Sequence, residues 1–374
     1  MTATLRWRAD GEERQGSWLS PLSAPPPRLG VADDRTTASV ALARARRGEG
    51  LVYRGDFRNA RQLLAAMGRR LRPRHSPRDR DPATLFRAER ERTRTEHDVL
   101  SRLLVPVEQG FKVPLRTAPD VTEPLAEALR ADAALPGLLP LRDLLGMVGA
   151  HEWRRKGVEV PALGIRVHPH YGVYAPIRGE YVDLVASAAA SWPVSGKRAA
   201  DVGTGTGVLA FVLARAGAHV VATDAEPRAV ACARENAERL GLSDRVEIVE
   251  ADLFPPGEER FQVVISNPPW VPAEATTPLE RAVYDPRGAF LARLVAALPE
   301  RLVPGGEAWV VISDLAELLG LRAPGHLEKL ASDAGLRVGD VRQARPSHPR
   351  ARDRDDPLHA VRSREVTRLF RLLL

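Results

Sequence analysis

Asp201-Val202-Gly203-Thr204-Gly205-Thr206-Gly207 is the stretch that decides the fold. It follows a short apolar run beginning at Ala199, and a helical pattern begins after it at Val208. Glycines let the backbone come close to a ligand, and the free amides of a helix N-terminus favour a carboxylate or another polar group. The spacing is Gly-x-Gly-x-Gly, which differs from the Gly-x-Gly-x-x-Gly typical of dinucleotide-binding proteins. The stretch therefore predicts a strand, a ligand-binding turn and a helix.

Short apolar strands alternate with helices on both sides of this turn. The predicted strands are Ala199–Val202, His219–Thr223, Val246–Val249, Phe261–Ser266 and Glu307–Ser313, and the predicted helices are Gly207–Ala216, Pro227–Leu240 and Gly288–Leu302. Such alternation predicts a parallel sheet with helices on both faces. Leu336–Arg342 and Val366–Leu374 are also strand-like, and we expect them to pair antiparallel at a sheet edge. The predicted fold class is therefore α/β, a Rossmann-like, mostly parallel sheet with an antiparallel edge strand.

Three acidic residues, Asp201, Asp224 and Asp252, end three successive predicted strands. Open α/β sheets bind ligands at the carboxyl ends of their strands. A carboxylate at Asp224 could accept both hydroxyl groups of a ribose, and one at Asp252 could accept an adenine amino group. Each aspartate alone could equally be a turn or capping residue, so their combination carries the interpretation.

A second motif, Asn267-Pro268-Pro269-Trp270, follows the predicted strand that ends at Ser266. Asn-Pro-Pro can be a simple turn after a strand. Behind the glycine-rich turn, however, it indicates a site that holds a planar nitrogen. The Asn267 side-chain oxygen and the Pro268 carbonyl could each accept one N–H bond from that nitrogen, and Trp270 offers a flat face.

With these motifs, residues 158–374 resemble a class I methyltransferase that depends on S-adenosylmethionine (SAM). The matching pieces are Asp201–Gly207, Asp224, Ala251-Asp252-Leu253 and Asn267–Trp270. The Asn-Pro-Pro-aromatic form is similar to amino-methyltransferases: release-factor glutamine methyltransferases, ribosomal-RNA guanine methyltransferases and DNA adenine methyltransferases. The resemblance covers about the last three-fifths of the chain.

The resemblance implies roles for individual residues. Gly203 and Gly205 would approach the methionine part of SAM, Asp224 would hold the ribose, and Asp252 would meet the adenine. The expected cofactor-binding residues are Asp201, Gly203, Thr204, Gly205, Gly207, Asp224, Asp252 and Asn267. The expected catalytic residues are Asn267, Pro268 and Trp270, which would hold the acceptor nitrogen in line with the sulfonium methyl group.

Two departures from the glutamine enzymes bear on the acceptor. Those enzymes usually end the motif in tyrosine, where this chain has Trp270, and their Pro-Arg-Pro-containing loop is replaced here by Pro176–Glu180. The preceding Tyr171–Pro176 segment still resembles the corresponding segment of the glutamine and guanine enzymes. Expected pocket residues are Tyr174, Pro269, His170 and Tyr284, although an Asp-Pro turn explains the region of Tyr284 equally well.

No metal site is expected. His168 and His170 alternate, so on a strand they would share one face. A metal ion would need a third ligand that the sequence does not supply. Cys232 is the single cysteine, and it lies in a predicted helix far from Asn267. We expect it to serve packing, which argues against a cysteine nucleophile.

Composition limits the class of protein and its partners. The net charge is +7, and residues 58–94 hold twelve arginines against four acids. Such a stretch indicates either a surface for nucleic acid or an acidic partner, or a solvated helix face. A single cysteine, no apolar run that could span a bilayer, and a charged N-terminus favour a cytoplasmic protein without a membrane partner.

Three regions are expected along the chain. Residues 1–35, which include Pro25-Pro26-Pro27, are expected to be weakly ordered. Residues 36–157 are expected to form a mainly helical recognition module, with N-caps at Asp56 and Asp81 and a polar linker between them. Residues 158–374 are expected to form the methyltransferase domain.

The predicted function is SAM-dependent methylation of a planar amide or amino nitrogen, with a glutamine-type amide of a protein as the leading macromolecular acceptor. The alternatives are an amino group of a base in RNA or DNA and a small molecule. A SAM-binding or RNA-binding protein without catalytic activity is a rival that the intact Asn267 and Trp270 disfavour. A nicotinamide oxidoreductase is a second rival, and the glycine spacing disfavours it.

Overall fold

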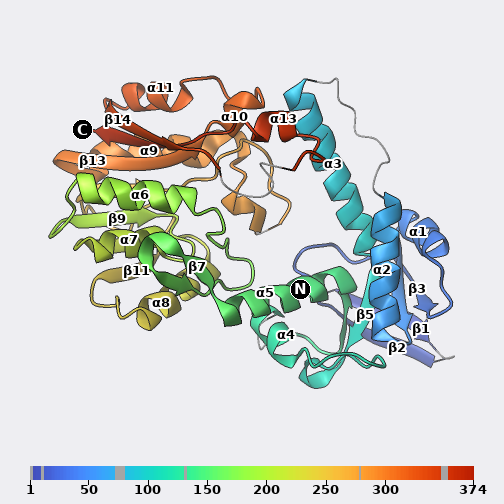
Figure 1. The fold of residues 1–374 in the computed structure, drawn as a ribbon. Helices are drawn as coiled ribbons and strands as arrows, with labels where there is room; N and C mark the ends of the chain where they lie inside the picture. The colour runs from blue at the N-terminus through green and yellow to red at the C-terminus, as the bar shows by residue number, and fades with distance from the viewer. Residues whose placement is uncertain (1–2, 10–11, 72–80, 130–132, 278, 347–352) are drawn as a thin grey trace. The chain divides into compact units, whose positions relative to one another are not determined.

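The computed structural model describes residues 3–9, 12–71, 81–129, 133–277, 279–346 and 353–374. The chain divides into two compact units (Figure 1). Unit 1 comprises Met1–Arg78 and Arg87–Glu152, and unit 2 comprises Asp79–Phe86 and Trp153–Leu374. Unit 2 carries all the sequence motifs described above.

Unit 2 is built on a seven-stranded sheet with the order β11-β10-β9-β12-β13-β15-β14. The strands are β9 (Arg198–Val202), β10 (His219–Asp224), β11 (Val246–Glu250), β12 (Phe261–Ser266), β13 (Leu302–Ser313), β14 (Arg337–Ala344) and β15 (Thr367–Leu373). The first five strands in this order pair in parallel, and β15 pairs antiparallel with both β13 and β14. The prediction of a mostly parallel α/β sheet is confirmed.

The antiparallel strand is not at the edge, which corrects one detail of the prediction. β15 lies between β13 and β14, so β14 forms the edge and runs parallel to the first five strands. The two strands do pair antiparallel, as expected, with Arg337 opposite Leu373. The last strand is inserted into the sheet because its consecutive residues Leu369 and Phe370 are buried on opposite faces.

Helices cover both faces of this sheet. Ala199, Val220 and Val263 of the strands belong to one apolar cluster, which also takes in residues of α6 (Glu180–Ser191), α7 (Val208–Arg215) and α8 (Pro227–Arg239). Their neighbours Ala200 and Val264 belong to a second cluster, with α9 (Ala289–Arg301) and α11 (His326–Asp333). Burial on both faces explains why these strands are continuous apolar runs in the sequence.

Short elements complete unit 2. They are β7 (Val158–Val160), η2 (Pro161–Leu163), β8 (Ile165–Val167), η3 (Leu279–Ala282), η4 (Pro286–Gly288), α10 (Leu315–Leu318) and α13 (His359–Arg362). β7 and β8 form a two-stranded antiparallel sheet ahead of α6. The segment between β14 and β15, for which no helix was expected, contains α13.

Unit 1 contains a six-stranded mixed sheet with the order β1-β2-β6-β5-β4-β3. Its strands are β1 (Thr4–Ala9), β2 (Glu12–Trp18), β3 (Arg28–Asp33), β4 (Glu49–Arg54), β5 (Leu103–Val107) and β6 (Gly137–Pro140). The helices with residues in this unit are α1 (Ala38–Arg46), α2 (Phe57–Leu71), α3 (Pro82–Leu100), α4 (Thr122–Leu129) and α5 (Leu141–Lys156), with η1 (Gln109–Phe111) after β5.

The expectations for the front of the chain were wrong in two respects. Residues 1–35 are not weakly ordered throughout, since β1, β2 and β3 all lie there. Residues 36–157 are rich in helices, as expected, but they do not form a separate helical module, because β4, β5 and β6 complete a sheet with those strands. Polar residues dominate β2, and few side chains of either strand reach the apolar cluster of this sheet: Trp7 and Trp18 are buried in it, and Leu5 packs against it. That sparse pattern conceals the strands.

The helix starts in this part were predicted correctly. The Asp56 carboxylate accepts the Arg58 N–H at 2.8 Å as α2 begins, and Asp81 accepts the Thr84 N–H at 3.1 Å as α3 begins. α3 ends at Leu100, and β5 starts at Leu103. Most of the predicted polar linker, residues 72–80, lies outside the described residues. Among the described helices, none is long and apolar enough to cross a membrane.

Candidate active site

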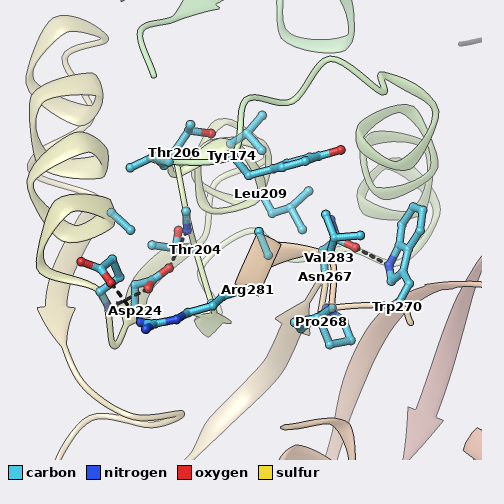
Figure 2. Close-up of a pocket in the computed structure, with 18 of the residues that line it drawn as sticks. Tyr174, Thr204, Thr206, Leu209, Asp224, Asn267, Pro268, Trp270, Arg281 and Val283 are labelled. Carbon is cyan, nitrogen blue, oxygen red and sulfur yellow. Dashed lines mark hydrogen bonds and ion pairs between the residues drawn. The ribbon is translucent and has the colours of Figure 1, made fainter. Parts of the chain in front are cut away.

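A cavity of about 290 Å³ opens at the carboxyl ends of β9, β10 and β12. β9 lies between the other two strands, so the chain leaves it toward β10 on one side and later returns to its other side with β12. Such a change of direction leaves a crevice where α/β sheets bind their ligands. Figure 2 shows Asp224 toward one side of this cavity and Asn267 with Trp270 toward the other.

The glycine-rich turn forms the wall between β9 and α7. Gly205 has a φ of 56°. A Cβ atom added at this residue would have no other atom within 4 Å, so the backbone there faces open space. Gly207 has a φ of 88°, and a Cβ would lie 2.3 Å from the Phe211 ring. Gly205 therefore leaves room for a ligand, whereas Gly207 lets the turn pack on α7 and does not line the cavity.

Asp201 lines the cavity with a buried carboxylate. Its Oδ2 accepts the Thr204 hydroxyl at 2.7 Å and the Ala210 N–H at 3.0 Å. Its Oδ1 is buried and has no hydrogen-bond partner among the residues that the structure describes. Burial raises the pKa of Asp201 to about 7. A buried carboxylate oxygen without a donor fits a positively charged or N–H-bearing group of a ligand.

Asp224, at the end of β10, is tied to the same turn. Its Oδ2 accepts the Gly205 N–H at 3.0 Å, and its Oδ1 accepts the Glu226 N–H at 2.9 Å. Burial raises the pKa of this carboxyl group, against the lowering effect of these two backbone bonds. Each oxygen keeps further acceptor capacity, so the carboxylate can still receive ligand hydroxyl groups.

Asp252 is not part of the cavity in this structure. Its side chain is 61% exposed, and its Oδ2 lies 2.5 Å from Nη2 of Arg293 on α9. The expected adenine contact therefore has no support from the geometry. The residue follows β11, the outermost strand on that side, and its carboxylate pairs with α9.

The Asn267-Pro268-Pro269-Trp270 motif follows β12 directly, and all four residues line the cavity. The Trp270 indole Nε1 donates a hydrogen bond of 2.8 Å to Oδ1 of Asn267 (Figure 2). Pro268 is buried, and Asn267 and Trp270 are partly exposed. The motif thus places two carbonyl oxygens and an aromatic ring together at one side of the cavity.

Arg178 lies over the Trp270 ring, with its guanidinium carbon 4.9 Å from the ring centre. The guanidinium also binds Glu180 at 2.8 Å and Glu365 at 2.9 Å, two carboxylates that are almost fully buried. Burial opposes the charge of Arg178, but the two glutamates outweigh it and raise the pKa of the guanidinium. The loop that departs from the glutamine enzymes therefore contributes a cation to the cavity wall.

The segment that carries Tyr174 is held by α8. Asn236 is buried, accepts the His168 N–H at 2.8 Å with Oδ1, and donates to the Thr206 carbonyl at 3.2 Å with Nδ2. Cys232 is also fully buried and accepts the His170 N–H at 3.4 Å. The packing role expected for Cys232 agrees with this position, and burial raises its pKa to about 12.

His168 and His170 follow β8 instead of lying on it, and neither lines the cavity. The His168 Nδ1 lies 2.6 Å from the Arg154 carbonyl oxygen, and the His170 Nε2 lies 2.7 Å from Glu235. The expected pocket role of His170 is therefore wrong for this structure, because the ring turns toward α8. Among the described residues no group of side chains could hold a metal ion.

Both ends of the loop after Trp270 line the cavity, through Val271 and through Arg281, Ala282 and Val283. The two ends pair at Val271 and Tyr284, and the buried Asp285 accepts the Phe290 and Leu291 N–H groups at the start of α9. Tyr284 itself does not line the cavity, and its ring lies 6.3 Å from that of Phe86, also in unit 2. The simpler interpretation of this Asp-Pro turn as a structural cap therefore agrees with the structure.

Several lining residues were not predicted. Arg281 comes from η3 (Figure 2). Its guanidinium lies 3.7 Å from the carboxylate of Glu226, beyond β10. The others include Tyr181, Val208, Leu209, Phe290 and Leu315. Arg281 lies in a loop without a periodic pattern, so the sequence held no signal for it. Phe290 stands in the first turn of a helix that follows the motif strand, a position that topology alone could have indicated.

Comparison with known proteins places this site in a family. Residues 184–330 match the model of the methyltransferase small domain. The release factor glutamine methyltransferase of Gloeobacter violaceus is 31% identical over 221 residues, which cover 55% of this chain and 70% of that protein. The enzyme of the same name from Geobacter sulfurreducens is 39% identical over 126 residues, covering 30% of this chain and 43% of that protein.

The chain belongs to the release factor glutamine methyltransferase family. A methyltransferase domain of this family uses SAM as its methyl donor, so the predicted enzyme class and cofactor are confirmed at the level of the family. The chain spans about half the length of most of the curated relatives it matches. A solved methyltransferase from Pyrococcus furiosus matches with a TM-score of 0.40 at 15% identity, over 60% of this chain and 96% of that one.

Proposed function

We propose that this protein transfers a methyl group from SAM to an amide nitrogen of a protein, of the glutamine type. The observation that carries the proposal is the position of Asn267 and Pro268 in the same cavity as Asp224 and the glycine turn. The methyl group of the cofactor and the nitrogen of the acceptor can thus meet within one cavity. The names of the relatives support a release factor as the acceptor.

The cavity fits the cofactor at two places. The unpartnered Oδ1 of Asp201 can bind the amino group of the methionine part, and Asp224 can receive the ribose hydroxyls. SAM supplies an electrophilic methyl group on sulfur, and the acceptor nitrogen displaces the sulfur in line, leaving S-adenosylhomocysteine and one proton released to water. Gly203, Gly205 and Thr204 complete the proposed cofactor wall.

Asn267 and Pro268 would hold the acceptor. An amide nitrogen is a poor nucleophile because its lone pair is delocalised. The second lone pair of Asn267 Oδ1 and the Pro268 carbonyl can each accept one of its N–H groups, which orients the nitrogen and stabilises the positive charge developing on it. Tyr174 and Pro269, which line the same cavity, are proposed to border the acceptor.

Two features support a protein acceptor over a nucleic acid. The arginine-rich stretch is partly neutralised, since Arg92 of α3 pairs with Glu89 at 2.5 Å and Glu96 at 3.0 Å. Ile177 and Leu279 are 43% and 46% exposed, and each stands within two residues of the cavity-lining Arg178 or Arg281. We infer that these two exposed apolar side chains beside the pocket contact the acceptor protein.

The test is transfer of labelled methyl from SAM to a purified bacterial release factor, with total RNA and DNA as parallel acceptors. We expect labelled glutamine in the release factor and a shallow dependence on salt. Label in a base, with activity that falls steeply as salt rises because phosphate contacts release counterions, would instead establish the nucleic-acid alternative. A cytoplasmic location belongs to the same proposal, because release factors act there.

A further inference from the structure

The side chain of Asn267 already has one partner. The Trp270 indole Nε1 donates to Asn267 Oδ1 at 2.8 Å, and both residues line the cavity. An indole N–H can only donate, whereas a primary amide has an accepting oxygen and a donating nitrogen. The bond therefore fixes which end of the Asn267 amide holds the oxygen. It occupies one lone pair of that oxygen and leaves the other for an acceptor N–H.

The Trp270 ring is held in turn by Arg178. The guanidinium carbon lies 4.9 Å from the ring centre, a distance at which a cation is attracted to an aromatic face. The two nearly buried glutamates, Glu180 and Glu365, grip the guanidinium, and Glu365 also accepts the Ser313 hydroxyl at 2.7 Å. Arg178 is thus anchored to α6 and to the residues just before β15.

We propose that Trp270 and Arg178 are a positioning pair that fixes the Asn267 amide for methyl transfer, Trp270 through its indole N–H and Arg178 through stacking on the indole. The inference rests on the proposed function of Asn267. It also gives a role to tryptophan at the last motif position. A phenylalanine ring in that position would keep an aromatic face but has no N–H to direct the amide. One face of the indole is taken by Arg178, so a planar acceptor can use only the other.

The decisive variant is Trp270→Phe, with Trp153→Phe as its matched control. Trp153 belongs to the same unit, is 49% exposed and does not line the cavity. With a release factor as acceptor, we expect Trp270→Phe to lower kcat by about 10- to 100-fold, because a small misplacement of a reacting group has effects of that size. The KM for the acceptor and the affinity for SAM should change less than about threefold. The control should match the parent.

A second variant keeps the charge that the buried glutamates require. Arg178→Lys retains the cation but loses the planar group that stacks on the indole. We expect kcat to fall by about 3- to 10-fold with SAM affinity unchanged. Parental kcat in Trp270→Phe would overturn the role of the indole N–H, and a raised KM with unchanged kcat would show that Trp270 serves acceptor binding alone. Parental kcat in Arg178→Lys would overturn the role of the stacking.

A readout without an acceptor separates this inference from the proposed function. In nuclear magnetic resonance spectra of the full chain, the Trp270 indole N–H should exchange with solvent at least tenfold more slowly than in an Asn267→Ala variant. Equal exchange rates would show that the hydrogen bond does not form and would overturn the inference. Slow exchange in a protein that methylates no release factor would leave the positioning pair intact while rejecting the proposed acceptor.

Discussion

The backbone N–H of Gly205 donates a hydrogen bond of 3.0 Å to Oδ2 of Asp224. This bond joins the turn after β9 to the end of β10, two points that are 19 residues apart in sequence. The acid proposed to hold the ribose therefore also holds the turn proposed to approach the methionine part. A change at Asp224 should disturb both parts of the cofactor site.

Asp224→Ala should weaken SAM binding by about 1–3 kcal/mol, as expected when a buried hydrogen-bond partner is lost. Titration calorimetry measures the change directly. Asp333→Ala is the matched control, because Asp333 lies on α11, pairs with Lys329 and is 58% exposed. Asp252→Ala should have a smaller effect than Asp224→Ala, since its carboxylate pairs with Arg293 outside the cavity. An Asp224→Ala variant with parental SAM affinity would contradict the proposed ribose contact.

SAM affinity should depend on pH through Asp201. Burial raises the pKa of this carboxyl group to about 7, so in the free protein it is protonated below that pH. A cationic amino group binds better to the ionised form, so affinity should rise as the pH increases from about 6 to 8 and then level off. In an Asp201→Asn variant, the part of the pH dependence of SAM affinity that is due to this group should be absent. Calorimetry at several pH values measures it, and identical profiles would contradict the contact.

The same residue should influence stability with the opposite sign. Its folded pKa lies above its unfolded value, so between about pH 4 and 7 the folded chain binds more protons than the unfolded chain. The contribution of Asp201 to the free energy of unfolding should therefore fall as pH rises through this window. Thermal unfolding of the parent and Asp201→Asn at pH 5 and pH 8 tests this. A parental stability that gains more than the variant on raising the pH would refute it.

Asn267→Ala should abolish turnover while leaving SAM binding intact. The side chain contacts the proposed acceptor position, so its loss removes an interaction that matters in the transition state. We expect kcat to fall by at least about 100-fold, a size typical for loss of a group that stabilises developing charge. Methyl-transfer rates together with calorimetry measure the two effects. Near-parental methylation would show that Asn267 does not hold the acceptor.

Asn236 should couple the glycine turn to the Tyr174 segment. Asn236→Ala leaves the His168 N–H and the Thr206 carbonyl without their partner, and each unsatisfied buried group costs about 1–3 kcal/mol. We expect a lower melting temperature and weaker SAM binding. Asn236→Asp keeps the acceptor for His168 but loses the donor to Thr206, so it separates the two bonds. Parental SAM affinity in both variants would show that the tie has no effect on the site.

Phe86 should stabilise unit 2 although it lies far ahead of the rest of that unit in sequence. Its ring is buried in an apolar cluster with Val271, Leu319, Leu358 and Val361. Phe86→Ala should cost about 3–5 kcal/mol of unfolding free energy, with Val341→Ala, an exposed position in the same unit, as the control. Thermal unfolding monitored by circular dichroism measures both. Equal melting temperatures would contradict the packing.

This position also revises an expectation from the sequence. Residues 158–374 were expected to form the methyltransferase domain, which would allow a chain starting at Val158 to fold alone, because all the site strands lie within it. Such a chain lacks Asp79–Phe86, which belongs to unit 2. We therefore expect it to be less stable than unit 2 in the full chain, for the same physical reason as Phe86→Ala. A truncated chain as stable as the full unit would contradict both expectations.

The sequence alone determined the methyltransferase sheet and the order of its motifs. Strands buried on both faces appear as apolar runs, and helical segments alternate with them, so local pattern and final structure agree over residues 198–313. The glycine turn and Asn267–Trp270 could be located for the same reason. Each directly follows a strand, and parallel strands bring their carboxyl ends to one edge.

Only the tertiary structure decided what surrounds those motifs. β1 and β2 bury few residues, so their polar sequences hid the sheet of unit 1 until its strands were paired. The contact between Arg178 and Glu365 spans 187 residues, and nothing local in either segment indicates it. His170 turned to Glu235 and Asp252 to Arg293, because a side chain binds the nearest compatible group in space. The sequence thus determined which chemistry is present, and long-range packing determined which residues reach it.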